Sequence, residues 1–206
     1  MANDQSSRLG LFPIRQPFGN IPINYYRANT AIAMYRFQPV VLNNSGQVQV
    51  AQIIGASGIL GSIVGFLDSS KASLPSDMAL LTAGAFLPSS ADAYVAVADD
   101  PGQYFIMEED TGGTLIGSAN SSGQTVHFTY LATTGNTTTG VANVLIDRST
   151  LAADTGGVFT LIGPADNINS DGTTNTPTSA FAKWIVKINS HQNAPISGYK
   201  IADRPS

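Results

Sequence analysis

The chain has 206 residues, a formal net charge of −4 and no cysteine, and charged residues make up 12% of it, about half of the roughly 25% usual for soluble domains. The lack of cysteine excludes disulfides and thiolate-ligated zinc or iron–sulfur sites. The ten basic residues are too few and too scattered to neutralise many phosphates, so nucleic acid is disfavoured as a partner.

Residues 1–36 are predicted to form an extended N-terminal arm. This segment carries a net charge of +3, whereas residues 66–110 carry −7. Its prolines lie among apolar residues that follow neither a helical nor a strand period, so we expect no strand from the arm in the core fold. We expect it to dock on other subunits, a disordered tail being the alternative. The residues expected to make these contacts are Arg8, Phe12, Arg15, Phe18, Tyr25, Tyr26, Arg27 and Arg36.

From residue 37 onward, short apolar runs alternate with turn signals, and we assign residues 37–206 to a single β-rich domain. The runs 37–42 and 47–50 flank Asn-Asn-Ser-Gly at 43–46, which predicts a hairpin because Asn and Gly accept positive φ. The runs 93–97 and 103–107 flank a turn at 99–102 and predict a second strand pair.

Later runs alternate apolar and polar residues, so each strand is expected to bury one face. Val126, Phe128 and Tyr130 share one face, and Trp184, Val186 and Ile188 share another. The predicted strands are 125–130, 141–146, 158–162 and 183–188. The fold class is therefore mainly β, a β-sandwich or barrel with an extended N-terminal arm and at most one or two short helices, one of them at 77–86.

Residues that could carry chemistry are sparse, and we predict no catalytic, cofactor-binding or metal site. His127 and His191 belong to no recognisable motif, and we expect exposed positions for both. The carboxylates at 108–110 are interpreted as a solvated turn. The loop 167–172, with Asn167 first and Gly172 sixth, matches the first half of a calcium-binding loop, but the position for the bidentate Glu is Thr178, so an ordinary polar loop is favoured.

The longest apolar stretch, 53–67, is interrupted by glycines and is shorter than the roughly 20 residues of a membrane span. We therefore expect no membrane anchor. The N-terminal residues lack a secretory pattern, and we expect synthesis in the cytoplasm.

Four short motifs, in order, resemble the capsid cement proteins of tailed bacteriophages, which decorate and stabilise the head. In residues 92–105 a strand runs into Asp99-Asp100-Pro101 and then into an aromatic-bearing strand. The other three segments are 61–66, 158–163 and 186–192. The resemblance spans residues 37–192.

This resemblance implies a non-enzymatic virion protein that is made in the host cytoplasm and binds the capsid exterior. Its partners would be neighbouring major-capsid subunits, which it locks in the expanded shell, and sister copies of itself. Trimer, dimer and monomer stay open, and we favour the trimer. The alternative is a carbohydrate- or receptor-binding β-module of a phage tail or bacterial surface; Trp184, however, lies in an apolar alternation and is predicted to be core.

Overall fold

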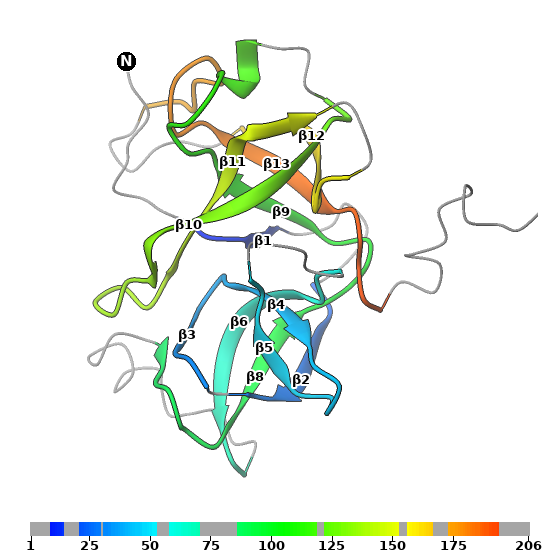
Figure 1. Cartoon of the computed structure of the whole chain (residues 1–206), viewed down its shortest axis with the longest axis vertical. Coiled ribbons are helices and arrows are strands. Elements are labelled where there is room, and N and C mark those ends of the chain that lie inside the picture. The colour runs from blue at the N-terminus through cyan, green and yellow to red at the C-terminus, as the bar shows by residue number, and fades with distance from the viewer. Residues whose placement is uncertain are drawn as a thin grey trace, which may run out of the picture.

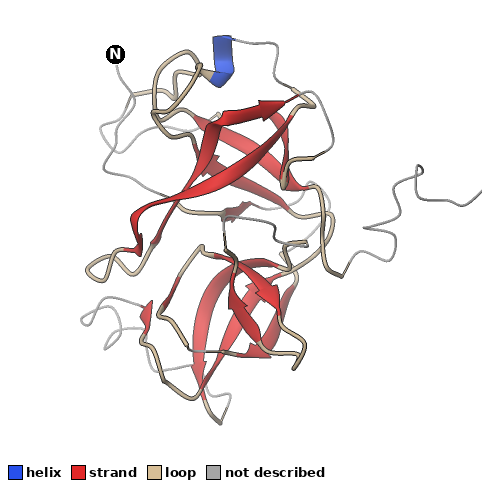
Figure 2. Ribbon diagram, in the orientation of Figure 1, coloured by secondary structure: helices blue, strands red, loops and turns tan. Residues whose placement is uncertain are grey.

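The molecule consists of two β-sheet halves. The computed structural model describes residues 9–14, 21–29, 31–52, 58–70, 86–118, 122–152, 156–166 and 173–193. Within them, a six-stranded and a five-stranded sheet lie one above the other along the longest axis (Figure 1), and strands dominate both (Figure 2). The predicted mainly β fold is confirmed: the curled antiparallel sheets form a half-barrel or sandwich-like arrangement.

The six-stranded sheet has the order β1-β9-β13-β12-β10-β11, and each neighbouring pair is antiparallel. Its strands are β1 (Phe12–Ile14), β9 (Tyr104–Glu108), β10 (Thr125–Gly135), β11 (Ala142–Ala152), β12 (Phe159–Pro164) and β13 (Lys183–Ile188).

The five-stranded sheet has the order β2-β8-β6-β4-β5 and curls toward a barrel. Ala28 forms a parallel bridge with Val48, and the Asn29 N–H donates to the Val48 carbonyl over 2.7 Å. These contacts bring the chain that follows β2 next to β5, so the two outer strands meet at one end. The strands are β2 (Ile23–Arg27), β4 (Pro39–Leu42), β5 (Val48–Val50), β6 (Gly61–Asp68) and β8 (Ala93–Ala98).

Each half has its own hydrophobic core, as the period-two alternation of the strands requires. Trp184, Val186 and Ile188 are 3%, 0% and 4% exposed in the core of the six-stranded sheet, which confirms the predicted inner face of β13. Val126 and Phe128 are buried in the same core. The second core lies inside the five-stranded sheet and includes Met34, Val40, Leu60, Ile63, Val95 and Val97.

The predicted hairpin at 43–46 is confirmed as the connection between β4 and β5. The Asn43 side-chain carbonyl accepts from the backbone N–H groups of Ser45 and Gln47, at 2.9 and 3.0 Å. Gly46 has φ 71°, a conformation that costs glycine little. Local turn chemistry therefore sets this register.

The second predicted strand pair is wrong in its pairing, although both strands exist. The turn forms, with the Gln103 N–H donating to the Asp100 carbonyl over 2.9 Å. However, β8 joins the five-stranded sheet and β9 the six-stranded one. Val95 and Val97 are buried in the core of the five-stranded sheet (the lower core), whereas Phe105 and Met107 are buried in the core of the six-stranded sheet (the upper core). This turn therefore links the two sheets.

The expectation that the arm adds no strand is also wrong. Residues 12–14 form β1 beside β9, and residues 23–27 form β2 beside β8. Pro13 is tolerated in β1 because this strand lies at a sheet edge, where a missing N–H need not break a ladder. Leu11 is fully buried in the upper core. The described arm segments are extended, but they belong to the fold.

The long β10–β11 hairpin reaches down to the other half near β3 (Met34–Tyr35), which pairs with β7 (Phe86–Leu87) (Figure 1). The Arg36 N–H donates to the Gly140 carbonyl, and the Ala142 N–H donates to the Arg36 carbonyl, each over 2.9 Å. Gly135 lies against the Tyr35 ring, where an added Cβ would come within 2.1 Å of a ring carbon. The hairpin thus joins the two halves.

Two sequence predictions fall on residues outside the described part of the chain. The helix expected at 77–86 overlaps the undescribed range 71–85, and Phe86 begins β7. The candidate calcium loop 167–172 lies wholly outside it. Among the described residues, the helical element is the short 3-10 turn η1 (Ile116–Ser118).

Candidate functional site

The structure separates the predicted arm contacts into exposed and partly covered residues. Tyr25 is 58% exposed and Phe12 is 36% exposed, with the Phe12 ring edge-on to Phe37 at 4.9 Å. Arg27 is exposed, whereas Tyr26 and Arg36 are half-buried. The remaining three, Arg8, Arg15 and Phe18, lie outside the described residues.

The outward face of β2 is the clearest apolar surface feature. Ile23, Tyr25 and Arg27 alternate on it, with Ile23 43% and Tyr25 58% exposed. In the described sheet β2 is an edge strand, paired on one side with β8. Exposed apolar side chains on a sheet edge are typical of binding sites, since such edges can accept another strand. We call Ile23, Tyr25 and Arg27 the β2 face.

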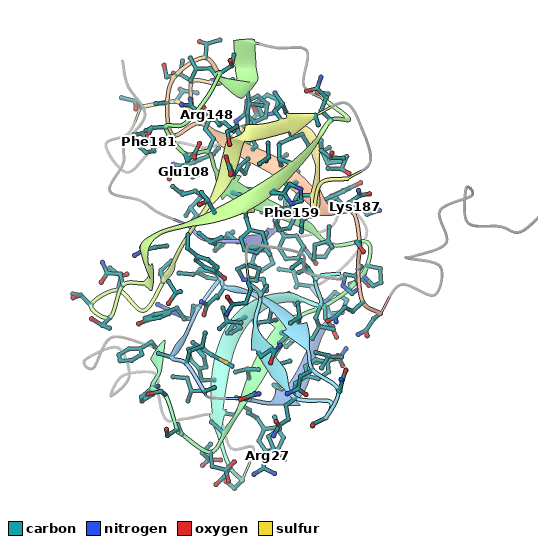
Figure 3. All side chains as sticks on the ribbon, viewed as in Figure 1. Arg27, Glu108, Arg148, Phe159, Phe181 and Lys187 are labelled. Carbon is teal, nitrogen blue, oxygen red and sulfur yellow. The ribbon has the colours of Figure 1, made fainter. Side chains whose placement is uncertain are left out.

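At the end of the β2 face, the Arg27 guanidinium lies 3.2 Å from the Asp92 carboxylate. Both side chains are more than half exposed, so the pair adds at most about 1 kcal/mol to stability. The pair forms part of the rim of an open pocket of about 500 Å³. Arg27 marks this place at the lower end of the molecule in Figure 3, far from Arg148 and Glu108.

The pocket has an apolar part and a polar part. Ala28, Ala31 and Ala91 are lining residues; Ala28 is also a member of the core of the five-stranded sheet, and Ala91 packs against that core. The polar lining comes from Arg27, Asn29, Gln47, Ser90 and Asp92. Three chain segments far apart in sequence therefore meet there: the end of β2, the start of β5 and the approach to β8.

A second polar cluster surrounds Asp99, which is 4% exposed at the end of β8. The Asn24 amide donates to both of its carboxylate oxygens, at 2.9 and 3.2 Å, and the Tyr26 hydroxyl donates to one of them. Asn193 donates to the same oxygen over 3.5 Å. Burial, the main cause, and the hydrogen bond to Asp99, the second cause, raise the pKa of Tyr26 to about 12. The Tyr26 hydroxyl therefore keeps its proton and donates to Asp99. This cluster ties β2 to the segment after β13.

The expected exposure of His191 is wrong: its side chain is 2% exposed. A parallel bridge to Ile59 holds the residue between the halves, and its Nδ1 accepts the Asn193 N–H over 3.0 Å. Burial lowers the pKa of His191, which favours neutral imidazole. Because Nδ1 is occupied by a backbone donor, this contact supports a structural role. His127 is half-buried on β10.

The interpretation of residues 108–110 as a solvated turn is wrong as well. Glu108 and Glu109 are fully buried, and the Arg148 guanidinium on β11 is 3.3 Å from Glu109 and 3.5 Å from Asp110. The Trp184 indole N–H donates to the second Glu109 oxygen over 3.0 Å. Arg148, Glu109, Asp110 and Trp184 form the Arg148 cluster, and Figure 3 shows Arg148 in the upper half of the molecule.

The backbone explains why this acidic run is buried. The Glu109 N–H donates to the Ala182 carbonyl and the Asp110 N–H to the Ile146 carbonyl, both over 2.9 Å, so the chain after β9 passes between β11 and β13. The Arg148 Nε also donates to the Gly112 carbonyl over 2.7 Å. Each Glu109 oxygen has a protein donor, which makes the Arg148 cluster a structural element.

The Arg148 cluster predicts a pH dependence of stability. Burial raises the pKa of Glu109 to about 7, against the lowering effects of Trp184 and Arg148. The folded state then binds more protons than the unfolded state between pH 4.5 and 7, so the free energy of unfolding falls as pH rises through this window, by up to about 3 kcal/mol. The lowered pKa of His191 has the opposite effect: below pH 6.5 the unfolded state binds more protons at this residue, so its contribution to the free energy of unfolding rises with pH.

Denaturant unfolding of the wild type and of Glu109→Gln, from pH 5 to 8, isolates the Glu109 contribution. Glutamine keeps an acceptor for the Trp184 N–H but does not titrate. We expect the free energy of unfolding of the wild type to fall relative to that of the variant as pH rises. Parallel pH curves for the two proteins would contradict the prediction.

Comparisons with protein-family models, curated proteins and solved structures give no match to this chain. Within the described ranges, no group of three or more His, Asp or Glu side chains is placed to hold a metal ion. In the same ranges no helix is long and apolar enough to cross a membrane.

The sequence and the structure agree on Tyr25 and Arg27 as surface residues of the N-terminal segment. Sequence reasoning missed the pocket, because Asn29, Gln47 and the Ser90–Asp92 segment come from three separate parts of the chain with no shared motif. It also missed the partnership of Arg148 with Glu109, which are 39 positions apart.

Proposed function

We propose that this chain is a cement protein on the outer surface of a tailed-phage capsid, where it stabilises the shell by bridging neighbouring major-capsid subunits. The observation that carries the proposal is the β2 face, where the apolar side chains of Ile23 and Tyr25 are exposed on an edge strand. The motif order in residues 37–192 supports it from the sequence side. The described polar clusters have structural partners, which agrees with a non-enzymatic role.

The β2 face has the composition of a protein-binding surface. Tyrosine and arginine are enriched among residues that dominate binding energies, and Tyr25 stands between Ile23 and Arg27. The edge of β2 also offers backbone groups to a partner strand. A capsid subunit that docks here would cover Ile23 and Tyr25. Sister copies, in a trimer, would occupy other surfaces such as that around Phe12.

The test is co-sedimentation with cement-free, expanded capsids of the phage that encodes the chain. Wild-type protein should bind in a saturable, stoichiometric manner. Replacing both Ile23 and Tyr25 with alanine should weaken binding at least about 30-fold, since a desolvated anchor contributes about 2 kcal/mol or more.

Ile162→Ala is the matched control, because Ile162 on β12 is 42% exposed, nearly the same as the 43% of Ile23. It should bind like the wild type. Thermal unfolding of each variant checks that the fold is retained. No binding by the wild type would overturn the capsid role, and full binding by the Ile23/Tyr25 double variant would move the contact away from β2.

A further inference from the structure

An open pocket lies at the end of the five-stranded sheet. Its volume of about 500 Å³ lies within the roughly 300–1,000 Å³ of small-molecule sites, which often occupy the mouths of β-barrels. Three alanines and five polar residues line it, and most of its wall is polar. Polar groups that converge on one hollow can orient a ligand.

The charge of the pocket selects the ligand class. Arg27 and Asp92 are paired at 3.2 Å, so the rim has one positive and one negative group. An anionic ligand would meet Asp92, and a cationic ligand would meet Arg27. A neutral ligand with many hydroxyls can accept from Arg27 and the amides of Asn29 and Gln47, and can donate to Asp92.

An aromatic ring lies on the same strand face. Tyr25 precedes Arg27 by two residues, which places the two side chains about 7 Å apart on the outward face of β2. The Tyr25 ring lies outside the pocket lining, is 58% exposed and can contact the apolar face of a sugar ring that extends past Arg27. Exposed aromatics beside amides and carboxylates are the pattern expected of a saccharide site.

Backbone conformation at the rim points to a ligand as well. Ser90 has φ 68°, in the left-handed region that serine rarely adopts. Such conformations cost on the order of 1 kcal/mol and concentrate where a site fixes the direction of a side chain. Ser90 lies in a turn and is one of the residues that line the pocket.

We propose that this pocket binds a neutral saccharide, through the amides of Asn29 and Gln47, the Ser90 hydroxyl and the Arg27–Asp92 pair, with Tyr25 against the sugar ring. This site goes beyond the capsid role and does not depend on it. Tyr25 and Arg27 belong to both the β2 face and the proposed saccharide site, so a capsid subunit docked on the β2 face and a saccharide in the pocket would exclude each other. An extended peptide is the competing neutral ligand.

The experiment applies the full chain to an array of neutral and sialylated oligosaccharides, followed by saturation-transfer NMR with the neutral glycans that bind. The wild type should bind at least one neutral glycan and should disfavour its sialylated form. The double variant Asn29→Ala and Gln47→Ala should bind that glycan at least about 10-fold more weakly. It keeps the backbone bond from Asn29 to Val48.

Gln49→Ala is the matched control, since Gln49 is the next outward-facing glutamine on β5 and is not part of the pocket lining. It should bind like the wild type. Absence of any neutral-glycan binding, binding unaffected by the double variant, or preferential binding of unstructured peptides would overturn the proposal. The double variant should bind capsids normally, so failure of the saccharide site and failure of the capsid role are distinguishable.

Discussion

Replacing Arg148 with methionine should lower the free energy of unfolding by about 3–5 kcal/mol at pH 8. Methionine fills similar space but leaves two carboxylates without their cation, and Glu109 is fully buried. Breaking a buried ion pair by removing one partner is strongly destabilising, because the remaining charge stays desolvated. Chemical denaturation followed by Trp184 fluorescence would measure the loss.

Arg27→Met is the matched control, because Arg27 makes an exposed ion pair and its loss should cost about 1 kcal/mol or less. The cost of Arg148→Met should also shrink at pH 5, where Glu109 is protonated in the folded protein. Equal and small losses for both arginine variants would show that the Arg148 cluster contributes little to the fold.

The strands themselves were predictable because period-two alternation is a local property. The inner face of β13 followed from Trp184, Val186 and Ile188, and the hairpin at 43–46 followed from its Asn and Gly. Neither inference required knowledge of a partner strand. Both depend on backbone geometry that neighbouring residues fix.

Strand pairing was not predictable in the same way, because alternation says which face is buried and not what covers it. The turn after β8 contains Asp100 and Gly102 and has the chemistry of a hairpin. Yet β8 and β9 separate into two sheets. The choice depends on two cores whose members come from distant parts of the chain.

The buried acidic run and the pocket were missed for a related reason. Charged residues such as those at 108–110 are expected to be solvent-exposed unless a paired cation is known. No sequence spacing links Arg148 to them. The pocket lining depends on how the end of β2 closes against β5. Tyr25 and Arg27 were predicted as contact residues of an extended arm; the structure shows both exposed on strand β2, and the contacts themselves stay a prediction.

Deleting residues 1–26 should abolish cooperative folding, which reverses the expectation that this segment is separable. The deletion removes β1 and all but the last residue of β2, so β9 and β8 each lose a neighbour. It also removes Leu11, whose N–H donates to the Phe37 carbonyl over 2.7 Å and whose carbonyl accepts from Ser62. The Asn24 and Tyr26 donors to Asp99 are lost as well.

The size of the effect follows from single residues of the deleted segment. Leu11→Ala alone should cost about 2–5 kcal/mol, as for other fully buried leucines, whereas a domain of this kind has only about 5–15 kcal/mol in total. Circular dichroism and thermal unfolding would follow both variants, with deletion of residues 1–8 as the control, because that deletion leaves β1, β2 and Leu11 in place. A truncated chain that unfolds with wild-type cooperativity would show that the segment is separable after all, and a Leu11→Ala loss below about 1 kcal/mol would show that Leu11 adds little to the core of the six-stranded sheet.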